Sequence, residues 1–345
     1  MIDSCKLQTN NKNAKTKGTV AFVIDFLPAM ALISSQPCIL IKTIRWKGAF
    51  IGKTIICRMI PNIFHFVFGM ALDFGGKPFS LVHYLSIRSA VDLNKPEKTI
   101  FHYQYEPEGE YWEMAKPMLT LNKITAPDKF MGSQLQHVAH KADVVRLQAL
   151  KETGGIYLDL DTISVRPLTE LLNHSFVIGQ EQKAAYSPRN RRQKIKYALR
   201  KRIGLIKEEK AASTGLCNAV LLSEQNSRFV NLWLAEYKTF RSKGRDKYWN
   251  EHSVKVPLQL ALRYPEDITL LDPYAFHYPL YTQDGLRTMF EEQTDFPGAY
   301  LHHLWESFSW DSYLSRLTIQ DIFQMDTTYN MIARKFLHLP KPSYL

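Results

Sequence analysis

The segment "GGIYLDLDT", residues 154–162, places two carboxylates at the end of an apolar run. The residues before it, 137–153, have helical spacing, and the two glycines that follow are typical of a left-handed helix C-cap. In the strand expected next, alternation puts Ile156, Leu158 and Leu160 on one face and Tyr157, Asp159 and Asp161 on the other. Cores rarely accept unpaired charges, so the Asp pair predicts a ligand site at the end of this strand.

The residues upstream of the pair predict the opening of a nucleotide-binding α/β sheet. An apolar strand is expected at 60–70, a helix at 78–96 and an alternating strand at 98–107. Further on, the pattern predicts a strand at 175–181, helices at 227–240 and 256–265, and a strand at 267–273.

With 345 residues, the chain is long enough for one large α/β domain. We expect a leader or membrane-associated segment at 1–57, a catalytic domain at 58–315 and a helical tail at 316–345. A basic insertion at 187–210 interrupts the catalytic domain.

Most of the net charge of +11 lies in that insertion. Residues 189–207 contain nine Lys or Arg and no acid, with Ile195, Leu199 and Ile203 four positions apart. This predicts a basic amphipathic helix for an anionic membrane surface or a polyanion, and a solvated helix is the plain alternative. Nucleic acid is disfavoured because Tyr197 is the only aromatic residue available for stacking there.

The N-terminal segment and the cysteines bear on localisation. Residues 19–41 are fairly apolar, but the charge-free part from Phe26 to Ile41 has 16 residues, whereas a membrane-spanning helix needs about 20. The four cysteines are far apart, so their spacing indicates neither a disulfide framework nor a zinc site. We expect a protein that is cytoplasmic or peripheral at a membrane, with a type II Golgi membrane protein as the alternative.

Paired carboxylates suit Mg²⁺ or Mn²⁺, which prefer oxygen ligands and accept diphosphate oxygens beside one or two protein carboxylates. A nucleotide-diphosphate sugar donor would need such an ion on its leaving group. Two alternatives remain for the Asp-x-Asp pattern taken by itself. It could form a turn, or it could belong to a haloacid-dehalogenase-type phosphohydrolase, although that type wants Thr or Val where this chain has Ile163.

Asp143 and Arg146 lie three positions apart on the preceding helix and therefore on one side of it. If that helix packs beside the sheet, the cation can face phosphate and the acid can accept hydrogen bonds from sugar hydroxyls. The alternative is an ordinary surface ion pair.

The segment 137–168, "HVAHKADVVRLQALKETGGIYLDLDTISVRPL", resembles the family 32 glycosyltransferases, a DXD-containing group that includes yeast α-1,6-mannosyltransferases and α-1,4-galactosyltransferases. The acid and arginine of the helix, the glycine pair, the tyrosine and both aspartates coincide with the family pattern. The likeness extends over roughly residues 60–314.

The resemblance implies a GT-A type fold, with a Rossmann-like mixed sheet flanked by helices. It also implies a retaining hexosyltransferase that uses a divalent cation, Mn²⁺ or Mg²⁺, and a UDP- or GDP-sugar donor. The acceptor would be a glycan or a lipid.

By position, the family pattern assigns roles to individual residues. The metal ligands would be Asp159, Asp161 and His303, with Asp159 alternatively facing ribose. The donor-binding residues would be His65 in the base pocket, Asp143, Arg146, Tyr157, Asn218 and Trp305. Plain alternatives are a core histidine for His303 and structural hydrogen bonding for Asn218.

The sequence offers no clear general base, which suits same-face substitution with the leaving diphosphate taking the acceptor proton. Glu181 is the candidate carboxylate for stabilising the transition state or for a covalent intermediate. A competing hypothesis is a catalytically silent subunit that only binds a nucleotide-sugar or glycan.

Overall fold

The computed structural model describes residues 39–46, 49–56, 59–182, 195, 199 and 213–337. Most of the predicted leader therefore lies outside the described residues, as does the basic insertion apart from Ile195 and Leu199, which are both exposed. The described residues all belong to one compact unit within residues 37–345. None of the described helices is long and apolar enough to cross a membrane.

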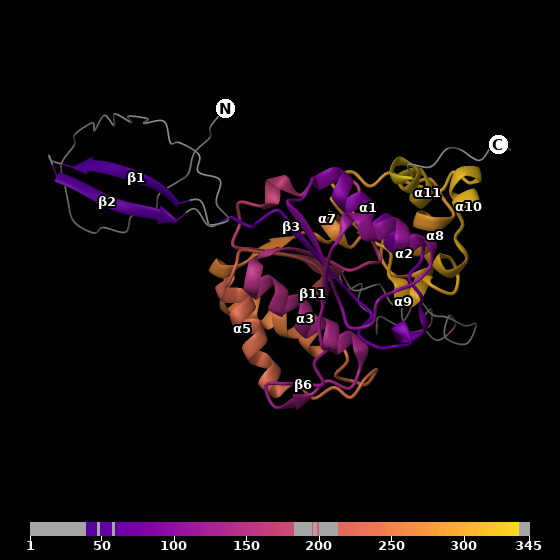
Figure 1. Ribbon diagram of the computed structural model, residues 1–345, viewed down its shortest axis with the longest axis horizontal. Coiled ribbons are helices and arrows are strands. Elements are labelled where there is room, and N and C mark those ends of the chain that lie inside the picture. The colour runs from indigo at the N-terminus through magenta and orange to yellow at the C-terminus, as the bar shows by residue number, and fades with distance from the viewer. Residues whose placement is uncertain are drawn as a thin grey trace. The chain divides into compact units, whose positions relative to one another are not determined.

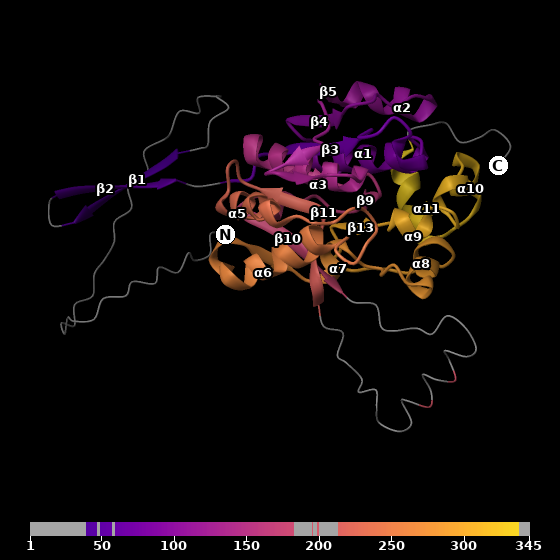
Figure 2. The ribbon, with the colours of Figure 1, turned by 90° about the horizontal axis from the view of Figure 1, so that it is seen from below.

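The main sheet has seven strands in the order β12-β10-β11-β8-β3-β4-β5 (Figures 1 and 2). Their bounds are β3 (Ile63–Phe68), β4 (Lys98–Tyr103), β5 (Thr120–Lys123), β8 (Gly155–Leu158), β10 (Phe176–Gln182), β11 (Ser213–Ser223) and β12 (Thr269–Leu271). Neighbouring strands are parallel except on either side of β11, which pairs antiparallel with both β8 and β10. Six strands therefore run one way and β11 runs the other.

The helices cover both faces of this sheet. They are α1 (Leu81–Asn94), α2 (Glu110–Ala115), α3 (Val138–Thr153), α5 (Arg228–Glu236), α6 (Val256–Arg263), α7 (Pro273–Phe276), α8 (Gln283–Phe290), α9 (Glu306–Ser309), α10 (Ile319–Gln324) and α11 (Thr328–Ala333). Buried side chains of α1, α2, α10 and α11 share one core with the sheet, and those of α3, α5 and α6 share another on the opposite face. Figure 1 shows α3 and α5 on one side of β3 and β11, with α1 on the other.

Three small sheets complete the described structure: β1 (Ile39–Trp46) with β2 (Ala49–Ile56), β6 (Lys129–Phe130) with β7 (Ser133–Gln134), and β9 (Thr162–Ser164) with β13 (Leu301–His303). The hairpin of β1 and β2 falls within the segment expected to be a leader. The pairing of β9 with β13 is antiparallel and sets Thr162 opposite His303.

The predicted elements agree with these bounds. The strand, helix and strand expected at 60–107 are β3, α1 and β4, and the helix before the glycine pair is α3. Gly154 has a φ of +68°, and a Cβ there would lie 2.6 Å from the backbone nitrogen of Gln225. Gly155 has a φ of +111°, and its Cβ would lie 2.3 Å from the Ile63 carbonyl oxygen. Both positions need glycine because the chain must turn sharply from α3 into a strand packed against β3.

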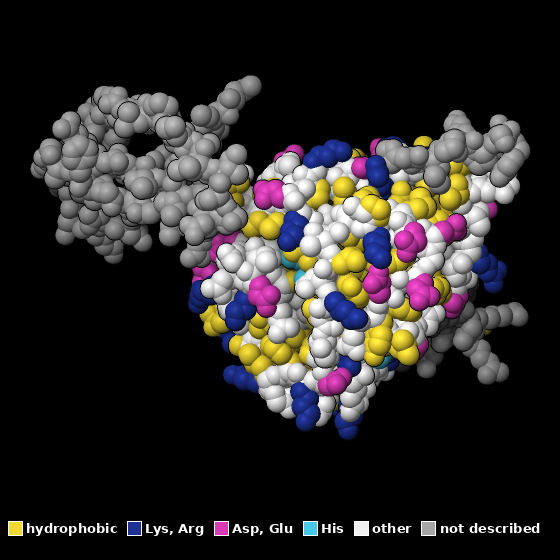
Figure 3. All heavy atoms as spheres, viewed as in Figure 1, with side chains coloured by type: hydrophobic (Ala, Val, Ile, Leu, Met, Phe, Trp, Pro, Cys, Tyr) yellow, Lys and Arg dark blue, Asp and Glu magenta, His cyan; other side chains and the backbone are white. Residues whose placement is uncertain are grey.

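The tail expected at 316–345 is helical in its described part. Ile322, Tyr329 and Ala333 of α10 and α11 are buried in the same core as α1. These helices therefore pack on the sheet domain. On the face seen in Figure 3, Lys and Arg side chains alternate with Asp and Glu over the described residues. This mixture agrees with the placement of the net positive charge in the basic insertion.

Candidate active site

The two aspartates lie at the carboxyl end of β8, as predicted, but in a turn. The strand ends at Leu158, and β9 begins at Thr162. The Asp159 N–H donates to the Ala219 carbonyl at 2.8 Å, and the Leu304 N–H donates to the Asp161 carbonyl at 2.7 Å. The strand therefore ends earlier than predicted, because a turn follows it that is held between β11 and the segment after β13. The predicted alternation still holds in the contacts: Ile156, Leu158 and Leu160 share one core, and Tyr157 contacts Asp159.

The helix pair Asp143 and Arg146 reaches the first aspartate. Arg146 Nη2 lies 3.3 Å from Asp143 Oδ1, and Arg146 Nη1 lies 3.1 Å from Asp159 Oδ1. Asp143 is 6% exposed and Arg146 is 5% exposed. The alternative of a surface ion pair is therefore wrong, because α3 presents both side chains to the sheet.

Two more predicted residues complete this network. The Asn218 amide donates to Asp143 Oδ1 at 2.7 Å, and Arg146 Nη1 donates to the Asn218 carbonyl at 2.8 Å. The Arg146 guanidinium lies 4.4 Å from the centroid of the Tyr157 ring, and the Tyr157 hydroxyl donates to Asp159 Oδ1. The structure thus brings five of the predicted site residues into one contiguous polar cluster.

Burial and charge have opposing effects in this cluster. Burial raises the pKa of Asp159, and the Arg146 guanidinium opposes that rise. Burial would lower the pKa of Arg146, but the charges of Asp159, Tyr157 and Asp143 outweigh burial and raise it. Arg146 is therefore a permanent cation held at a fixed place beside Asp159.

Asp161 faces a different set of partners. His303 Nε2 lies 3.2 Å from Asp161 Oδ2, and the Glu306 N–H donates to the same oxygen at 2.7 Å. Burial alone would raise the pKa of Asp161, but His303 and the Glu306 N–H lower it below its usual value. Burial would lower the pKa of His303, but the Asp161 carboxylate raises it well above the usual value.

Asp159, Asp161 and His303 offer one ligand atom each, and these atoms all lie within 4.8 Å of one another. Two carboxylate oxygens and an imidazole nitrogen form a donor set that suits a small divalent cation, with room left for donor oxygens. The predicted metal residues therefore fit such an ion, although they come from segments more than 140 positions apart.

Sequence reasoning missed the residues that support this triad. Glu306 Oε2 pairs with Lys77 Nζ at 2.8 Å, and Glu306 Oε1 accepts from His83 Nε2 at 3.0 Å. His83 Nδ1 accepts the Ser80 N–H at the start of α1, which fixes the ring. In the sequence, only Glu306 could have been recognised as a supporting residue, because it directly follows "HHLW", whereas Lys77 and His83 belong to no motif.

Two predicted residues lie beside His303. Glu181 is on β10, where burial raises the pKa of its carboxyl and the charge of His303 opposes the rise. The Trp305 ring lies 4.1 Å from the His303 ring, centroid to centroid, and its indole N–H donates to the Pro279 carbonyl at 2.8 Å. Because its one polar atom is engaged with the backbone, Trp305 supports His303 and presents no hydrogen-bonding group to a donor.

His65, expected in a base pocket, is placed elsewhere. It is 1% exposed in the middle of β3, where its Nε2 lies 2.9 Å from the Gly154 carbonyl and its Nδ1 lies 3.0 Å from His102 Nε2. Both nitrogens are engaged at the junction of α3 and β8. The ring therefore has a structural hydrogen-bonding role, and the expected pocket does not form around it.

A cavity of about 450 Å³ does lie at the same edge of the sheet, because the carboxyl ends of the parallel strands meet there. It is lined by residues that follow β3 and β4 and by the last residue of β5: Leu72, Phe74, Pro78, Phe79, Gln104, Tyr105, Glu106, Glu108 and Lys123. The Phe79 ring is 5.3 Å from the His83 ring, so the His83 and Glu306 contacts link the cavity wall to Asp161.

A mixed α/β sheet with paired carboxylates at the carboxyl edge and a buried acid and arginine beside them fits an enzyme class that binds a diphosphate through a divalent cation, as nucleotide-sugar transferases do. The family described as "Glycosyltransferase sugar-binding region containing DXD motif" matches residues 92–178. The chain is 35% identical over 285 residues to glucan organizing enzyme 1 of Cryptococcus neoformans var. grubii serotype A, covering 81% of this chain and 71% of that protein. The chain belongs to this family of DXD-containing glycosyltransferases, which confirms the resemblance to family 32.

Solved structures with a similar chain trace are also glycosyltransferases. The galactosyltransferase LgtC, in complex with donor and acceptor sugar analogues, is 12% identical with a TM-score of 0.38, over 81% of this chain and 98% of that one. Mouse xyloside xylosyltransferase 1 is 15% identical with a TM-score of 0.39, over 71% and 98%. Together with the family membership, the seven-stranded mixed sheet flanked by helices confirms the predicted GT-A type fold.

Proposed function

We propose that the chain is a metal-dependent, retaining hexosyltransferase that moves a hexose from a UDP- or GDP-sugar to a glycan acceptor. The observation that supports this most strongly is the convergence of Asp159, Asp161 and His303 at the edge of the sheet, next to the buried Asp143 and Arg146. Both aspartates have a partner within the protein, Arg146 for Asp159 and His303 for Asp161, so the support for a cation is the closeness of the three ligand atoms.

In this proposal, Asp159, Asp161 and His303 hold Mn²⁺ or Mg²⁺, which as a Lewis acid would stabilise the charge that develops on the leaving diphosphate. Arg146 contributes a second, fixed positive charge on the Asp159 side. Asp143, positioned by the Asn218 amide, offers its carboxylate to donor sugar hydroxyls.

The nucleoside half of the donor would occupy the cavity of about 450 Å³ at the ends of β3, β4 and β5. Phe74, Phe79 and Tyr105 supply apolar and aromatic surface for a base, and Lys123 and Gln104 supply polar groups. This location replaces the one expected around His65.

Retention of configuration is proposed from the family resemblance. Glu181 is the candidate carboxylate for stabilising the transition state or for forming a covalent intermediate. The charge of His303, a proposed metal ligand, lowers the pKa of this carboxyl against the effect of burial, so Glu181 is near enough to the site to stabilise a cation-like transition state. The anomer formed first, followed by NMR during transfer, tests retention. A glycosyl adduct trapped on Glu181 and found by mass spectrometry would replace same-face substitution with a covalent intermediate.

The name of the relative, glucan organizing enzyme 1, favours a glycan over a lipid as acceptor. An anionic membrane contact through residues 189–207 stays a prediction, because that segment lies outside the described residues. Membership in a glycosyltransferase family decides against the phosphohydrolase alternative.

The test is donor hydrolysis across UDP- and GDP-sugars, with Mn²⁺, Mg²⁺ or EDTA, for the wild type, Asp161→Asn and Asp128→Asn. Asp128 is a matched control because its side chain is 82% exposed and its recorded ion-pair partner is Lys141 on α3. We expect metal-dependent release of one nucleotide, lost in Asp161→Asn and kept in Asp128→Asn.

Hydrolysis that survives EDTA, or that is equal in Asp161→Asn, would contradict the metal-dependent proposal. Donor binding that raises the melting temperature without any hydrolysis or transfer would favour the catalytically silent binding subunit instead.

A further inference from the structure

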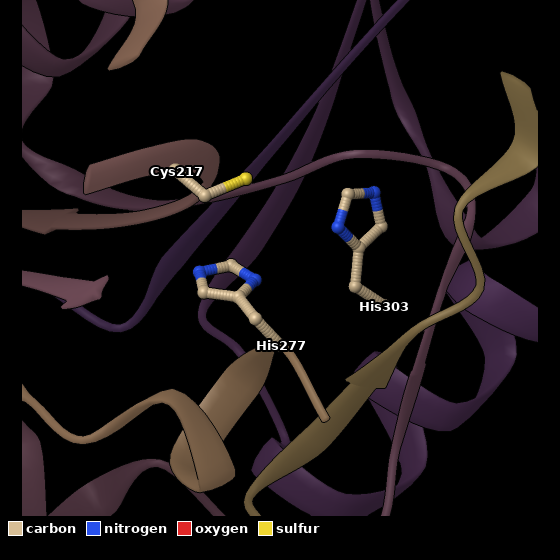
Figure 4. A group of neighbouring side chains, drawn as sticks. All are labelled: Cys217, His277 and His303. Atoms are coloured by element: carbon tan, nitrogen blue, oxygen red, sulfur yellow. The ribbon is translucent and has the colours of Figure 1, made fainter. Parts of the chain in front are cut away.

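A second group of ligand-type side chains lies on the other side of His303. Cys217 on β11, His277 at the end of α7 and His303 at the end of β13 offer one ligand atom each, all within 4.8 Å of one another. All three side chains are buried: Cys217 is 6% exposed, His277 is 0% and His303 is 8%. Figure 4 shows the Cys217 sulfur and the two imidazole rings directed toward a common space.

The imidazole nitrogens in this space are poorly paired, although His303 interacts with the Cys217 thiol and lowers its pKa against the effect of burial. Both ring nitrogens of His277 and the Nδ1 of His303 have no hydrogen-bond partner among the residues that the structure describes. A fully buried imidazole with two unpaired nitrogens is unfavourable, because the ring has lost its hydrogen bonds to water without gaining others. The edge-to-face contact between the His277 and His303 rings, 5.8 Å between centroids, accounts for packing but satisfies neither nitrogen.

The sheet makes room for this ring. Gly179 on β10 is the cross-strand partner of Cys217 on β11, at an irregularity in the strand pairing. A Cβ on Gly179 would lie 2.8 Å from both Cδ2 and Nε2 of His277. The glycine therefore lets the imidazole lie against the strand, at the level of the Cys217 thiol.

We propose that Cys217, His277 and His303 form a binding site for a thiophilic divalent cation such as Zn²⁺, and that this ion competes with the Mn²⁺ or Mg²⁺ site for His303. A thiolate and two imidazoles are a donor set that zinc prefers, and one tetrahedral position remains for a further ligand. With Zn–S near 2.3 Å and Zn–N near 2.0 Å, the ligand atoms must come to about 3.3–3.6 Å from one another. The ligand atoms therefore need to close by up to about 1.5 Å from the present spacing of at most 4.8 Å.

The competition follows from the two nitrogens of one ring. His303 Nε2 faces Asp161, so the ring nitrogen that Figure 4 shows directed toward Cys217 and His277 is Nδ1. A neutral imidazole has one lone pair and one N–H. A zinc ion on Nδ1 therefore requires the proton on Nε2, which can then only donate to Asp161. A cation bound by Asp161 and Nε2 requires the opposite tautomer.

Zinc binding also needs the thiolate form of Cys217, whose proton would leave to solvent as the sulfur–metal bond forms. Burial raises the pKa of this thiol, so the bond to the ion must supply the free energy of deprotonation. The predicted result is an inhibitory site that senses thiophilic metal. The competition rests on the proposed function, whereas the Cys217 site itself does not.

The site is tested with Co²⁺ as a spectroscopic probe of the purified full chain, because a thiolate ligand gives an intense charge-transfer band. The variants are Cys217→Ser and His277→Gln, with Cys57→Ser as the matched control for loss of a cysteine. We expect the band in the wild type and in Cys57→Ser. We also expect its loss in Cys217→Ser, and an affinity lowered by about 100-fold or more in His277→Gln. A wild type without the band, or a band that survives Cys217→Ser, would overturn the site.

The competition is tested by adding Zn²⁺ to Mn²⁺-supported donor hydrolysis and comparing the activity ratio with and without zinc in each variant. Zinc should inhibit the wild type and Cys57→Ser, and much less Cys217→Ser. Equal inhibition in Cys217→Ser would refute the competition. A Co²⁺ band without hydrolysis of any donor would leave the site standing and count against the proposed function, and hydrolysis without the band would do the reverse.

Discussion

The hydrogen-bonded pair of His65 and His102 predicts a steep loss of stability in mild acid. The Gly154 carbonyl can only accept, so His65 Nε2 carries the proton of that 2.9 Å bond. His65 Nδ1 must then accept from His102 Nε2 at 3.0 Å, and His102 Nδ1 accepts from the Asn122 amide at 2.9 Å. All four ring nitrogens in this series of hydrogen bonds have a hydrogen-bond partner of the right kind only while both rings are neutral.

Burial lowers the pKa of His65 to about 4 and that of His102 to about 3, from 6.5 for an exposed histidine. Between those values and 6.5 the unfolded chain binds more protons than the folded one, so stability is present above about pH 6.5 and is lost as the pH falls toward 4. One proton corresponds to about 1.4 kcal/mol per pH unit. Near pH 5 the two rings together should contribute a slope of about 2.5 kcal/mol per pH unit.

The assay is urea unfolding followed by tryptophan fluorescence at several values between pH 4.5 and 6.5. His102→Gln should reduce the slope of unfolding free energy against pH by about 1.3 kcal/mol per unit, since one titrating ring is gone. Asn122→Ala is the control, because it removes the 2.9 Å bond without removing a titrating group and should lower stability while largely keeping the slope. Parallel pH profiles for the wild type and His102→Gln would refute the reasoning.

Three further changes test the site. Arg146→Met leaves the buried Asp143 and the partly exposed Asp159 without their cation and should lower the free energy of unfolding by about 3 kcal/mol in a urea titration, so a loss below about 1 kcal/mol would contradict the network. Glu306→Gln keeps the backbone N–H bond to Asp161 but weakens the ion pairs with Lys77 and His83 that hold this segment, and it should raise the Mn²⁺ concentration for half-maximal donor hydrolysis about 10-fold; an unchanged value would exclude this supporting role. Gly179→Ala pushes a Cβ into the His277 ring and should cost about 1–3 kcal/mol, measured as a lower melting temperature, whereas unchanged melting would mean that the ring moves freely.

Local patterns predicted the parts of the site that lie within one element or its immediate neighbour. Asp143 and Arg146 share one side of α3 because they are three positions apart, and Gly154 and Gly155 direct the chain into β8. These features depend on backbone geometry over a few residues, which the sequence specifies directly. The family resemblance then added His303 and Asn218, which no local pattern indicates.

The error at His65 has a physical cause. The sequence shows an imidazole in the middle of an apolar strand with no hydrogen-bond partner nearby, so the ring could be taken for a ligand-binding group. In the structure its partners are His102, the Gly154 carbonyl and Thr153, which come from other segments. Likewise the wide spacing of the cysteines gave no sign of a metal site, because His277 and His303 approach Cys217 only after β10, β11 and β13 are assembled.

The sequence by itself predicted β3, β4, β8, β10 and β12 with the helices between them, the sharp turn after α3 and the two carboxylates at the end of β8, but it did not predict β5 or the antiparallel β11. Only the tertiary structure decided that Asp159 faces Arg146 while Asp161 faces His303 and Glu306, and that His303 lies between two groups of metal-type ligands. The reason is that periodicity specifies which face of an element a side chain occupies, whereas its partners depend on long-range strand pairing. The register that sets Thr162 opposite His303 is such a pairing, and no local pattern in either strand encodes it.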